Sequence, residues 1–443
     1  MAPKNKDKPN IKELGISNPK SGQAIDISNG MIELKYYESI LSNHISATII
    51  YGDTGNSVGE GKNKKALIDG LPVRGGEPVR IRVVDPNNNE LKFINKDAFY
   101  VNRVVGVSPT TKKSIAQFDL CTKEYLSNEM TRVRKRYSGK ISESVKKIAK
   151  DILKLQKIDI EETSNSYNFI GNERKPFYTL TWLGTKSIPT EKYGNTAGFF
   201  FFQTQEGYQF KSADTLVGPT KGGGSADSKG SKKFEYTDTD KRQSGYGKIL
   251  QYNINQNIDL QDKLTAGAYD NISHYFNPYT FKVDAQEFNI SKQSGGGVKT
   301  AGTELDFVME EFRKEKNPTR GMTMVLDVGT LPNGVDGLKQ TAQWKMKQEE
   351  TNDKIKQRVV QSIMRYNQLY SVSVDIMIEG DFSLKAGDTI YCEFPDLGSE
   401  TKRPNPKSSG TYLISSLCHK VTPSRCYTSL NLIRDSFGKG KAK

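Results

Sequence analysis

The side chains that could do chemistry in this chain are few, and a metal site is the first possibility to weigh. Cys418, His419 and Cys426 are near one another in the sequence. They lack the paired C-x2-C spacing and the second nearby histidine of a structural zinc site. Cys121 and Cys392 complete the four cysteines, which fit a reducing compartment where cysteine packs as a small apolar residue. We therefore expect no metal and no cofactor.

Two pairs of carboxylates could be proposed as the acid and the base of a glycosidase. They are Glu206 with Asp214 and Glu379 with Asp381. Such pairs are common in turns, and a pair predicts a reaction only when the separation of its carboxyl groups is known. The three histidines have no neighbouring base in the sequence. These observations favour a protein that is not an enzyme.

A glycine-rich segment at 55–61, followed by Lys62, has the look of a phosphate-binding loop. The pattern G-x4-G-K-[ST] would need glycine at position 56 and Ser or Thr at position 63. The chain has Asn56 and Asn63 instead. The segment is better interpreted as an insertion in a loop between two strands.

The most informative pattern is that the two ends of the chain resemble each other. The landmarks of the two copies, in order, are Gly52, Gly76, Tyr100 and Leu120, then Gly380, Gly387, Tyr412 and Leu432. The interval from the second glycine to the tyrosine is 24 residues in one copy and 25 in the other, and tyrosine to leucine is 20 in both. The two glycines are 24 residues apart in the first copy and 7 in the second, so the first copy carries a 17-residue insertion. Loop closure entropy grows slowly with length, so such an insertion costs little.

Each copy has the features of a small antiparallel barrel or curved sheet. Residues 372–378 alternate apolar and polar side chains, which is the period of a strand with one wet face. The four glycines punctuate the strands as turns. The alternative is that any two β-meanders look this similar. If the two ends are copies of one unit, the residues expected to fill the barrels are Tyr100, Phe118, Leu120, Tyr412, Leu430 and Leu432.

Two equivalent units in one chain have a consequence for symmetry. Oligomers are usually closed and cyclic, so a trimer of this chain would be a ring of six similar modules. The C-terminal stretch contains a distinctive set of residues: Gly380, Leu384, Gly387-Asp388, the run 410–414, His419 and the run 427–435. In these residues the sequence resembles the central hub of the baseplate in contractile-tailed bacteriophages. A second match is the aromatic run 198–212, which looks like a hairpin in the outer domain of that family. The matched segments cover about half the chain and contain no catalytic signature.

The resemblance implies an α+β fold that is mainly β, with two tail-tube-like antiparallel β-barrels and mixed α/β outer domains. Length agrees, since 443 residues should hold three or four domains. The expected organisation is a basic arm (1–24), barrel 1 (25–127), an outer domain with a basic helix (128–216), a Gly/Ser linker (217–232), a second outer region (233–355), barrel 2 (356–437) and a basic tail (438–443).

The surplus of 65 basic over 51 acidic residues is unevenly placed. Residues 131–157 hold ten Lys or Arg and two acids, and Ile141, Val145, Ile148 and Ile152 recur there at helical spacing. The favoured interpretation is a surface helix with a solvated basic face; the alternatives are a dock for an acidic partner or for nucleic acid. The residues expected in this peripheral basic patch are Arg132, Arg134, Lys135, Arg136, Lys146, Lys147 and Lys150.

The resemblance implies a structural, non-enzymatic homotrimer that joins a hexameric tail tube to a trimeric central spike. Its partners would be the tail tube protein, the spike protein and wedge or sheath-proximal baseplate proteins, with DNA passing transiently through the channel. Since a basic wall would retain DNA, we expect a neutral or acidic lumen, with Glu379, Asp388 and Glu393 as candidates. The alternatives are a hub or spike component of a related contractile injection system, and a tail-associated cell-wall hydrolase.

The same expectations place the protein in the virion. Hydrophobic residues make up 35% of the chain, below the ~45–50% usual for soluble domains, so we expect surfaces that neighbours complete. The N-terminal residues lack the apolar stretch of a signal peptide, and the longest apolar run, 199–202, is far too short to span a bilayer. We therefore expect synthesis in the bacterial host cytoplasm and no membrane insertion.

Overall fold

The structure is a computed structural model of the chain. It describes residues 8–20, 22–59, 64–109, 113–192, 196–218, 232–236, 247–256, 260–267, 270–277, 281–289, 318, 320–325, 359, 361–396, 404–405 and 407–435. Most of the predicted linker, from 219 to 231, and the predicted tail at 438–443 lie outside this part. No helix in the described part is long and apolar enough to cross a membrane.

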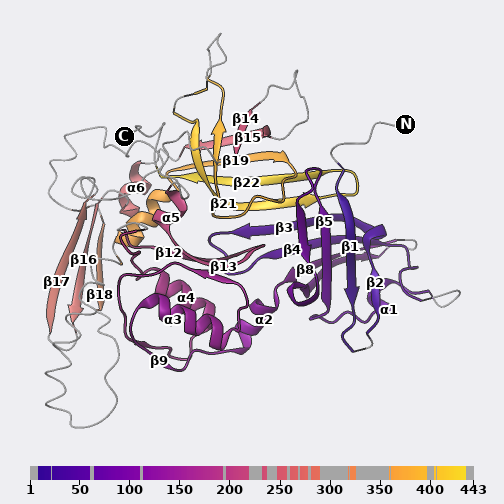
Figure 1. The fold of residues 1–443 in the computed structure, drawn as a ribbon, viewed down its shortest axis with the longest axis horizontal. Helices are drawn as coiled ribbons and strands as arrows, with labels where there is room; N and C mark the ends of the chain where they lie inside the picture. The colour runs from indigo at the N-terminus through magenta and orange to yellow at the C-terminus, as the bar shows by residue number, and fades with distance from the viewer. Residues whose placement is uncertain are drawn as a thin grey trace.

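The N-terminal β unit occupies the right of Figure 1. Its elements are β1 (Asn10–Ser17), β2 (Ala24–Asp26), η1 (Ser28–Gly30), β3 (Met31–Ser39), β4 (Ser46–Asp53), α1 (Leu67–Gly70), β5 (Pro78–Val84), β6 (Glu90–Phe93), η3 (Asn95–Asp97), β7 (Phe99–Pro109) and β8 (Ser114–Cys121). The C-terminal β unit lies above it in the figure. Its strands are β14 (Lys233–Tyr236), β15 (Lys248–Gln256), β19 (Val372–Glu379), β20 (Thr389–Glu393), β21 (Gly410–Val421) and β22 (Cys426–Arg434).

The remaining elements form an outer unit and a projecting sheet (Figure 1). The outer unit contains α2 (Lys123–Met130), β9 (Arg136–Tyr137), α3 (Ile141–Lys147), the π-helical η4 (Ile148–Ile152), β10 (Ile158–Ile160), β11 (Phe169–Ile170), α4 (Pro176–Gly184), β12 (Phe199–Thr204), β13 (Gly207–Ser212) and α5 (Ala213–Val217). The projecting part contains α6 (Leu260–Ala266), β16 (Asp270–Asn277), β17 (Lys282–Asn289) and β18 (Gly321–Val325). A helix over 361–369 leads back to the C-terminal unit. The predicted fold class, mainly β with mixed outer parts, is confirmed.

The two β units share one strand order. The N-terminal unit runs β1-β5-β7-β8-β4-β3, and the C-terminal unit runs β14-β20-β21-β22-β19-β15, with equivalent strands in the same order along the chain. Bulges occur at equivalent places, after Met31 and Ile249 and after Val101 and Ile414. Bulges are specific local features, so their coincidence supports a duplication of six strands.

Two predicted boundaries miss strands of these units. The second barrel was expected to begin at 356, but β14 and β15 complete its hydrogen-bonded ring. An insertion of more than one hundred residues separates them from β19, so local sequence patterns do not assign them to the barrel. The predicted arm at 1–24 likewise contains β1, which pairs with β5.

The two units differ in how their rings close. In the C-terminal unit β14 pairs in parallel with both β15 and β20, which closes six strands into a barrel. In the N-terminal unit the described residues of β1 and β3 do not pair. The free edge of β3 pairs with β21 of the other unit instead.

The glycine landmarks have different roles. Gly76 and Gly387 have positive φ angles of 88° and 90°. Gly76 donates its N–H to the Val101 carbonyl in β7, and Gly387 donates its N–H to the Ile414 carbonyl in β21. The other two do not correspond. Gly52 lies inside β4, and the strand register makes Asp53, one residue later, the equivalent of Gly380. A Cβ at Gly380 would lie 2.2 Å from the Cys426 sulfur, so close packing requires glycine there.

A single apolar core runs through both units. Five of the six predicted core residues lie in it, each at most 2% exposed; they are Phe118, Leu120, Tyr412, Leu430 and Leu432. The exception is Tyr100, which is partly exposed, while Phe99 is the buried aromatic residue and the equivalent of Tyr412. A shift of one residue moves a strand side chain to the opposite face.

Replacing Leu430 with alanine should lower the free energy of unfolding by about 2–5 kcal/mol, because it leaves a cavity in the shared core. The neighbouring Ser429 is exposed, so Ser429→Ala should change it by less than about 0.5 kcal/mol. Chemical denaturation of both variants measures the difference. Equal effects would show that the two faces of β22 are not distinguished as described.

Candidate functional site: the joint between the two barrel units

The candidate site is the place where the two units meet. Strands β3 and β21 pair antiparallel from Ser39 opposite Ser416 to Leu34 opposite Val421, and Ile40 donates its N–H to the Ser415 carbonyl at 2.9 Å. The pairing satisfies backbone groups that would otherwise be an open edge. It joins the two units into one continuous sheet, as the neighbouring positions of β3 and β21 in Figure 1 show.

Glu38 is a buried carboxylate at the centre of this joint. It is 2% exposed and accepts three hydrogen bonds: from the Tyr36 hydroxyl at 2.6 Å, from the Gln205 N–H at 2.6 Å and from the Ala386 N–H at 2.9 Å. Tyr36 lies on the same strand, Gln205 at the turn of the β12–β13 hairpin, and Ala386 in the loop before β20. One side chain therefore ties three parts of the molecule together. Burial raises the pKa of Glu38 to about 7.

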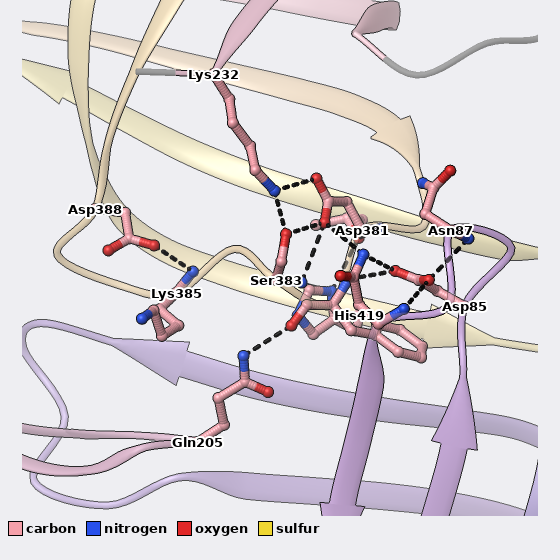
Figure 2. A network of polar contacts seen from close by, with 12 residues as sticks. Asp85, Asn87, Gln205, Lys232, Asp381, Ser383, Lys385, Asp388 and His419 are labelled. Carbon is pink, nitrogen blue, oxygen red and sulfur yellow. Dashed lines mark hydrogen bonds and ion pairs between the residues drawn. The ribbon is translucent and has the colours of Figure 1, made fainter. Parts of the chain in front are cut away.

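A second polar cluster holds the loop after β19 against the N-terminal unit (Figure 2). The Asp85 carboxylate accepts hydrogen bonds from the backbone of Asn87 and of Phe382, at 2.9 and 2.8 Å. The Asp381 carboxylate pairs with the Lys232 ammonium group at 2.8 Å and also binds Ser383. Each carboxylate thus organises its own turn and contacts a segment distant in the sequence.

His419 faces the same joint. It is fully buried, stacks on Tyr36 with 5.8 Å between ring centres, and its Nδ1 lies 2.9 Å from the Thr428 hydroxyl. Burial lowers the pKa of His419 to about 4, so the ring is neutral at pH 7. Within the described residues no group of three or more His, Cys, Asp or Glu could hold a metal ion.

The helix at 361–369 fixes the outer unit to the C-terminal barrel. Arg365 is 1% exposed; its guanidinium lies 2.7 Å from the Asp435 carboxylate after β22 and 3.6 Å from the Asp214 carboxylate in α5. The Tyr366 hydroxyl donates to the Phe199 carbonyl at 2.7 Å. The aromatic hairpin β12–β13 was predicted, and β12 is buried on both faces between the outer core and the barrels.

A groove of about 1260 Å³ crosses the sheet at the joint. It runs over β3, β21, β22, β19 and β15, and its wall contains no Lys or Arg. Its acidic residues are Asp375, which is exposed, and Glu38, whose carboxylate is buried in the joint; most of the others are Ser, Asn, Gln and Tyr. A wall of this composition offers hydrogen bonds but little attraction for phosphate groups.

The predicted lumen residues lie in three different settings. Glu379 shares a strand face with Asp375 and Met377, which line the groove. Asp388 instead accepts a hydrogen bond from the Lys385 N–H at 3.1 Å, and Glu393 pairs with Lys233 at 3.0 Å. The peripheral basic patch lies in the outer unit, away from the groove. Arg134, Lys135, Arg136, Lys146, Lys147 and Lys150 are exposed, and Arg132 is partly exposed.

The carboxylates that could have formed a glycosidase pair are engaged elsewhere. Asp214 is buried beside Arg365, whereas Glu206 lies at the hairpin turn and pairs with Lys385 at 2.7 Å. Asp381 is bound to Lys232, as described above. Glu38, whose carboxylate joins three segments, was missed by sequence reasoning. Its one signal is a carboxylate on the buried face of a strand, two residues after Tyr36.

No protein-family model and no curated protein matches the chain. Among solved structures it is similar to a tail protein from Neisseria meningitidis MC58, with a TM-score of 0.49 and 8% identity over 96% of both chains. It is similar to the 43 kDa tail protein of prophage MuSo2 from Shewanella oneidensis, with a TM-score of 0.49 and 8% identity over 96% of this chain and 98% of that one. A third is the E. coli c3393 protein, a component of the type VI secretion system, with a TM-score of 0.41 and 9% identity over 98% and 79%.

Glu38 should make the stability of the joint depend on pH. Its pKa is raised from 4.5 to about 7, so the folded state holds the proton more tightly than the unfolded chain. The resulting stabilisation is complete below about pH 4.5 and is lost as the pH rises through about 7. Compared with Glu38→Gln, the thermal midpoint of the parent should therefore fall across this window. Parallel midpoint curves for the two proteins would contradict the assignment.

Removing the Arg365 charge should be strongly destabilising, because it leaves Asp214 and Asp435 buried without their guanidinium partner. Arg365→Met should cost about 3–5 kcal/mol in the free energy of unfolding. Adding Asp435→Asn to that variant removes one of the stranded charges and should recover part of the loss. Denaturant unfolding of both variants checks this, and a double variant less stable than the single one would refute it.

Proposed function

We propose that the chain is a non-enzymatic structural hub of a phage tail baseplate. It assembles as a homotrimer whose six barrel units form a pseudo-sixfold ring. The ring joins a hexameric tail tube to a trimeric central spike and surrounds the channel through which DNA passes. The observation that supports this proposal is the pairing of β3 with β21 between two units of the same strand order.

That pairing is a head-to-tail contact. It joins the β3 edge of one unit to the β21 edge of the next, and β21 is the equivalent of β7, not of β3. Head-to-tail contacts between similar units repeat, and they close into a ring when the rotation allows. In a chain with two units, one such contact is internal, and the next must be made with another copy.

In the described part of the chain, the strand edges needed for the second contact pair with no further strand. In the described part of the chain, residues 103–109 of β7 pair with β8 alone, and residues 251–256 of β15 pair with β19 alone. These are the equivalents of the segments that β21 and β3 use in the internal joint. Open strand edges invite uncontrolled association, and pairing with a neighbouring protomer would remove them.

The equivalences also define the register of the contact between protomers. Cys418 lies opposite Tyr37 in the internal joint. The equivalent of Cys418 is Val105, since the two oppose Ser429 and Gln117 at matching positions of β22 and β8. By the same reasoning through β19 and β4, the equivalent of Tyr37 is Asn255. Val105 of one protomer should therefore lie opposite Asn255 of the next.

The channel wall follows from the same arrangement. The groove crosses the sheet strands that the ring would make continuous, and its wall carries no Lys or Arg. DNA would release few counterions on contact with it and would pass without being retained. The peripheral basic patch would face outward, toward solvent or the wedge and sheath-proximal proteins. On this proposal the protein is made in the host cytoplasm and resides in the virion.

A cysteine pair tests the proposed register. In a Cys418→Ser background, Val105→Cys combined with Asn255→Cys should give covalent trimers under oxidising conditions, because opposed strand residues have Cβ atoms within disulfide reach. The products are resolved by non-reducing electrophoresis of the purified protein.

The matched control is Val105→Cys with Gln251→Cys. Gln251 lies on the same strand face as Asn255, four residues away, or about 13 Å along the strand. It should give no covalent trimer. Efficient cross-linking of the control, or none with the Asn255 pair, would overturn the proposed contact.

A further inference from the structure

The outer unit carries an exposed surface that takes no part in the proposed ring. It is formed by residues 130–136 and 170–178, and it is referred to below as the outer patch. The two segments run antiparallel: Val133 bridges to Arg174, the Glu173 N–H donates to the Val133 carbonyl at 3.1 Å, and β9 pairs with β11. In Figure 1, β9 lies on the far side of the outer helices from the β12–β13 hairpin.

The side chains of the outer patch divide between the core and the surface. Val133 and Tyr137 are buried in the core of the outer unit. Arg134, Lys135 and Arg136 are exposed and Arg132 is partly exposed. Arg136 lies opposite Ile170 in the β9–β11 pair, so these two side chains share the exposed face.

Large apolar side chains are exposed in the same place. Met130 at the end of α2 is 79% exposed, Tyr178 in α4 is 52% exposed, and Ile170 is 43% exposed. The end of α2 is fixed to the start of α4 by the hydrogen bond from the Phe177 N–H to the Asn128 side chain, at 2.8 Å. These residues therefore border one surface and are not scattered over the unit.

The charge of the outer patch is positive. Glu173 is paired with Arg134 at 3.0 Å, and Glu129 is paired with Lys175. Within the described residues Lys135 and Arg136 form no ion pair. The Arg174 guanidinium lies over the Tyr178 ring, 5.1 Å from its centre, which holds both side chains in place.

We infer that the outer patch docks an acidic, partly apolar surface of a partner protein. Arg, Tyr and Met are the residues enriched at the centres of protein interfaces. The exposed apolar side chains of the patch can pack against apolar side chains of a protein partner; they are Met130, Tyr178 and Ile170. A phosphate backbone offers no such side chains. A protein partner is therefore favoured over nucleic acid, and the inference does not depend on the proposed ring.

Binding to three fluorescent probes tests the inference. The probes are a short acidic peptide containing leucine and phenylalanine, poly-glutamate of the same length, and a duplex DNA oligonucleotide. Measured by anisotropy with the full chain, the acidic apolar peptide should bind at least about tenfold more tightly than either other probe. Tyr178→Ala should weaken binding of the acidic apolar peptide and leave binding of poly-glutamate unchanged. Arg134→Glu combined with Arg136→Glu should weaken binding of both.

The matched control is Lys146→Glu with Lys150→Glu, which changes the charge equally on α3 and η4, outside the outer patch. It should leave binding of the acidic apolar peptide within about twofold. Thermal midpoints of all variants verify that they are folded, and Tyr178→Phe, which keeps the ring, should retain binding. Tightest binding of DNA, an equal loss in the control, equal affinity for poly-glutamate, or no binding of the acidic apolar peptide would each overturn the inference.

Discussion

The free edge of β3 is the constraint on which the rest of the structure depends. A strand edge exposes backbone N–H and C=O groups that must find partners. The C-terminal unit solves this by closing its ring through β14, whereas the N-terminal unit leaves β3 open and pairs it with β21. The pairing of β3 with β21 makes the two units one sheet. It also brings the hairpin turn at Gln205 and the loop at Ala386 together at Glu38, and a groove crosses the joint.

The duplicated units have become chemically different at their equivalent edges. Strand β3 carries Tyr36 and Glu38, and the equivalent positions of β15 are occupied by Ile254 and Gln256. The internal joint therefore contains a buried carboxylate with three donors, while the edge available to another copy carries none. A buried charge is costly unless its partners are permanently in place, which a single chain guarantees and a separate protomer does not. In the proposed ring, this difference would suit a joint made within one chain and an outer edge that pairs with another copy.

Local patterns in the sequence predicted much of this fold, and contacts between distant segments explain what was missed. Gly76 and Gly387 could be matched because a positive φ restricts the residue type at both turns. Tyr100 was misplaced by one position because β7 has a second bulge, between Val105 and Ser108, that β21 lacks, so Phe99 is the equivalent of Tyr412 and fills the core. Strands β14 and β15 were missed because their barrel partners lie beyond a long insertion. Glu38 could not be recognised, because its environment is assembled from three segments that no local pattern connects.

The central claim is that the internal joint is one of two kinds of contact in a closed ring. Native mass spectrometry of the purified full chain tests it most directly, since it counts copies without cross-linking. The account predicts a complex of three chains that persists on dilution, because each added protomer covers one β7 edge and one β15 edge. A stable monomer, or an assembly whose copy number is not three, would contradict it.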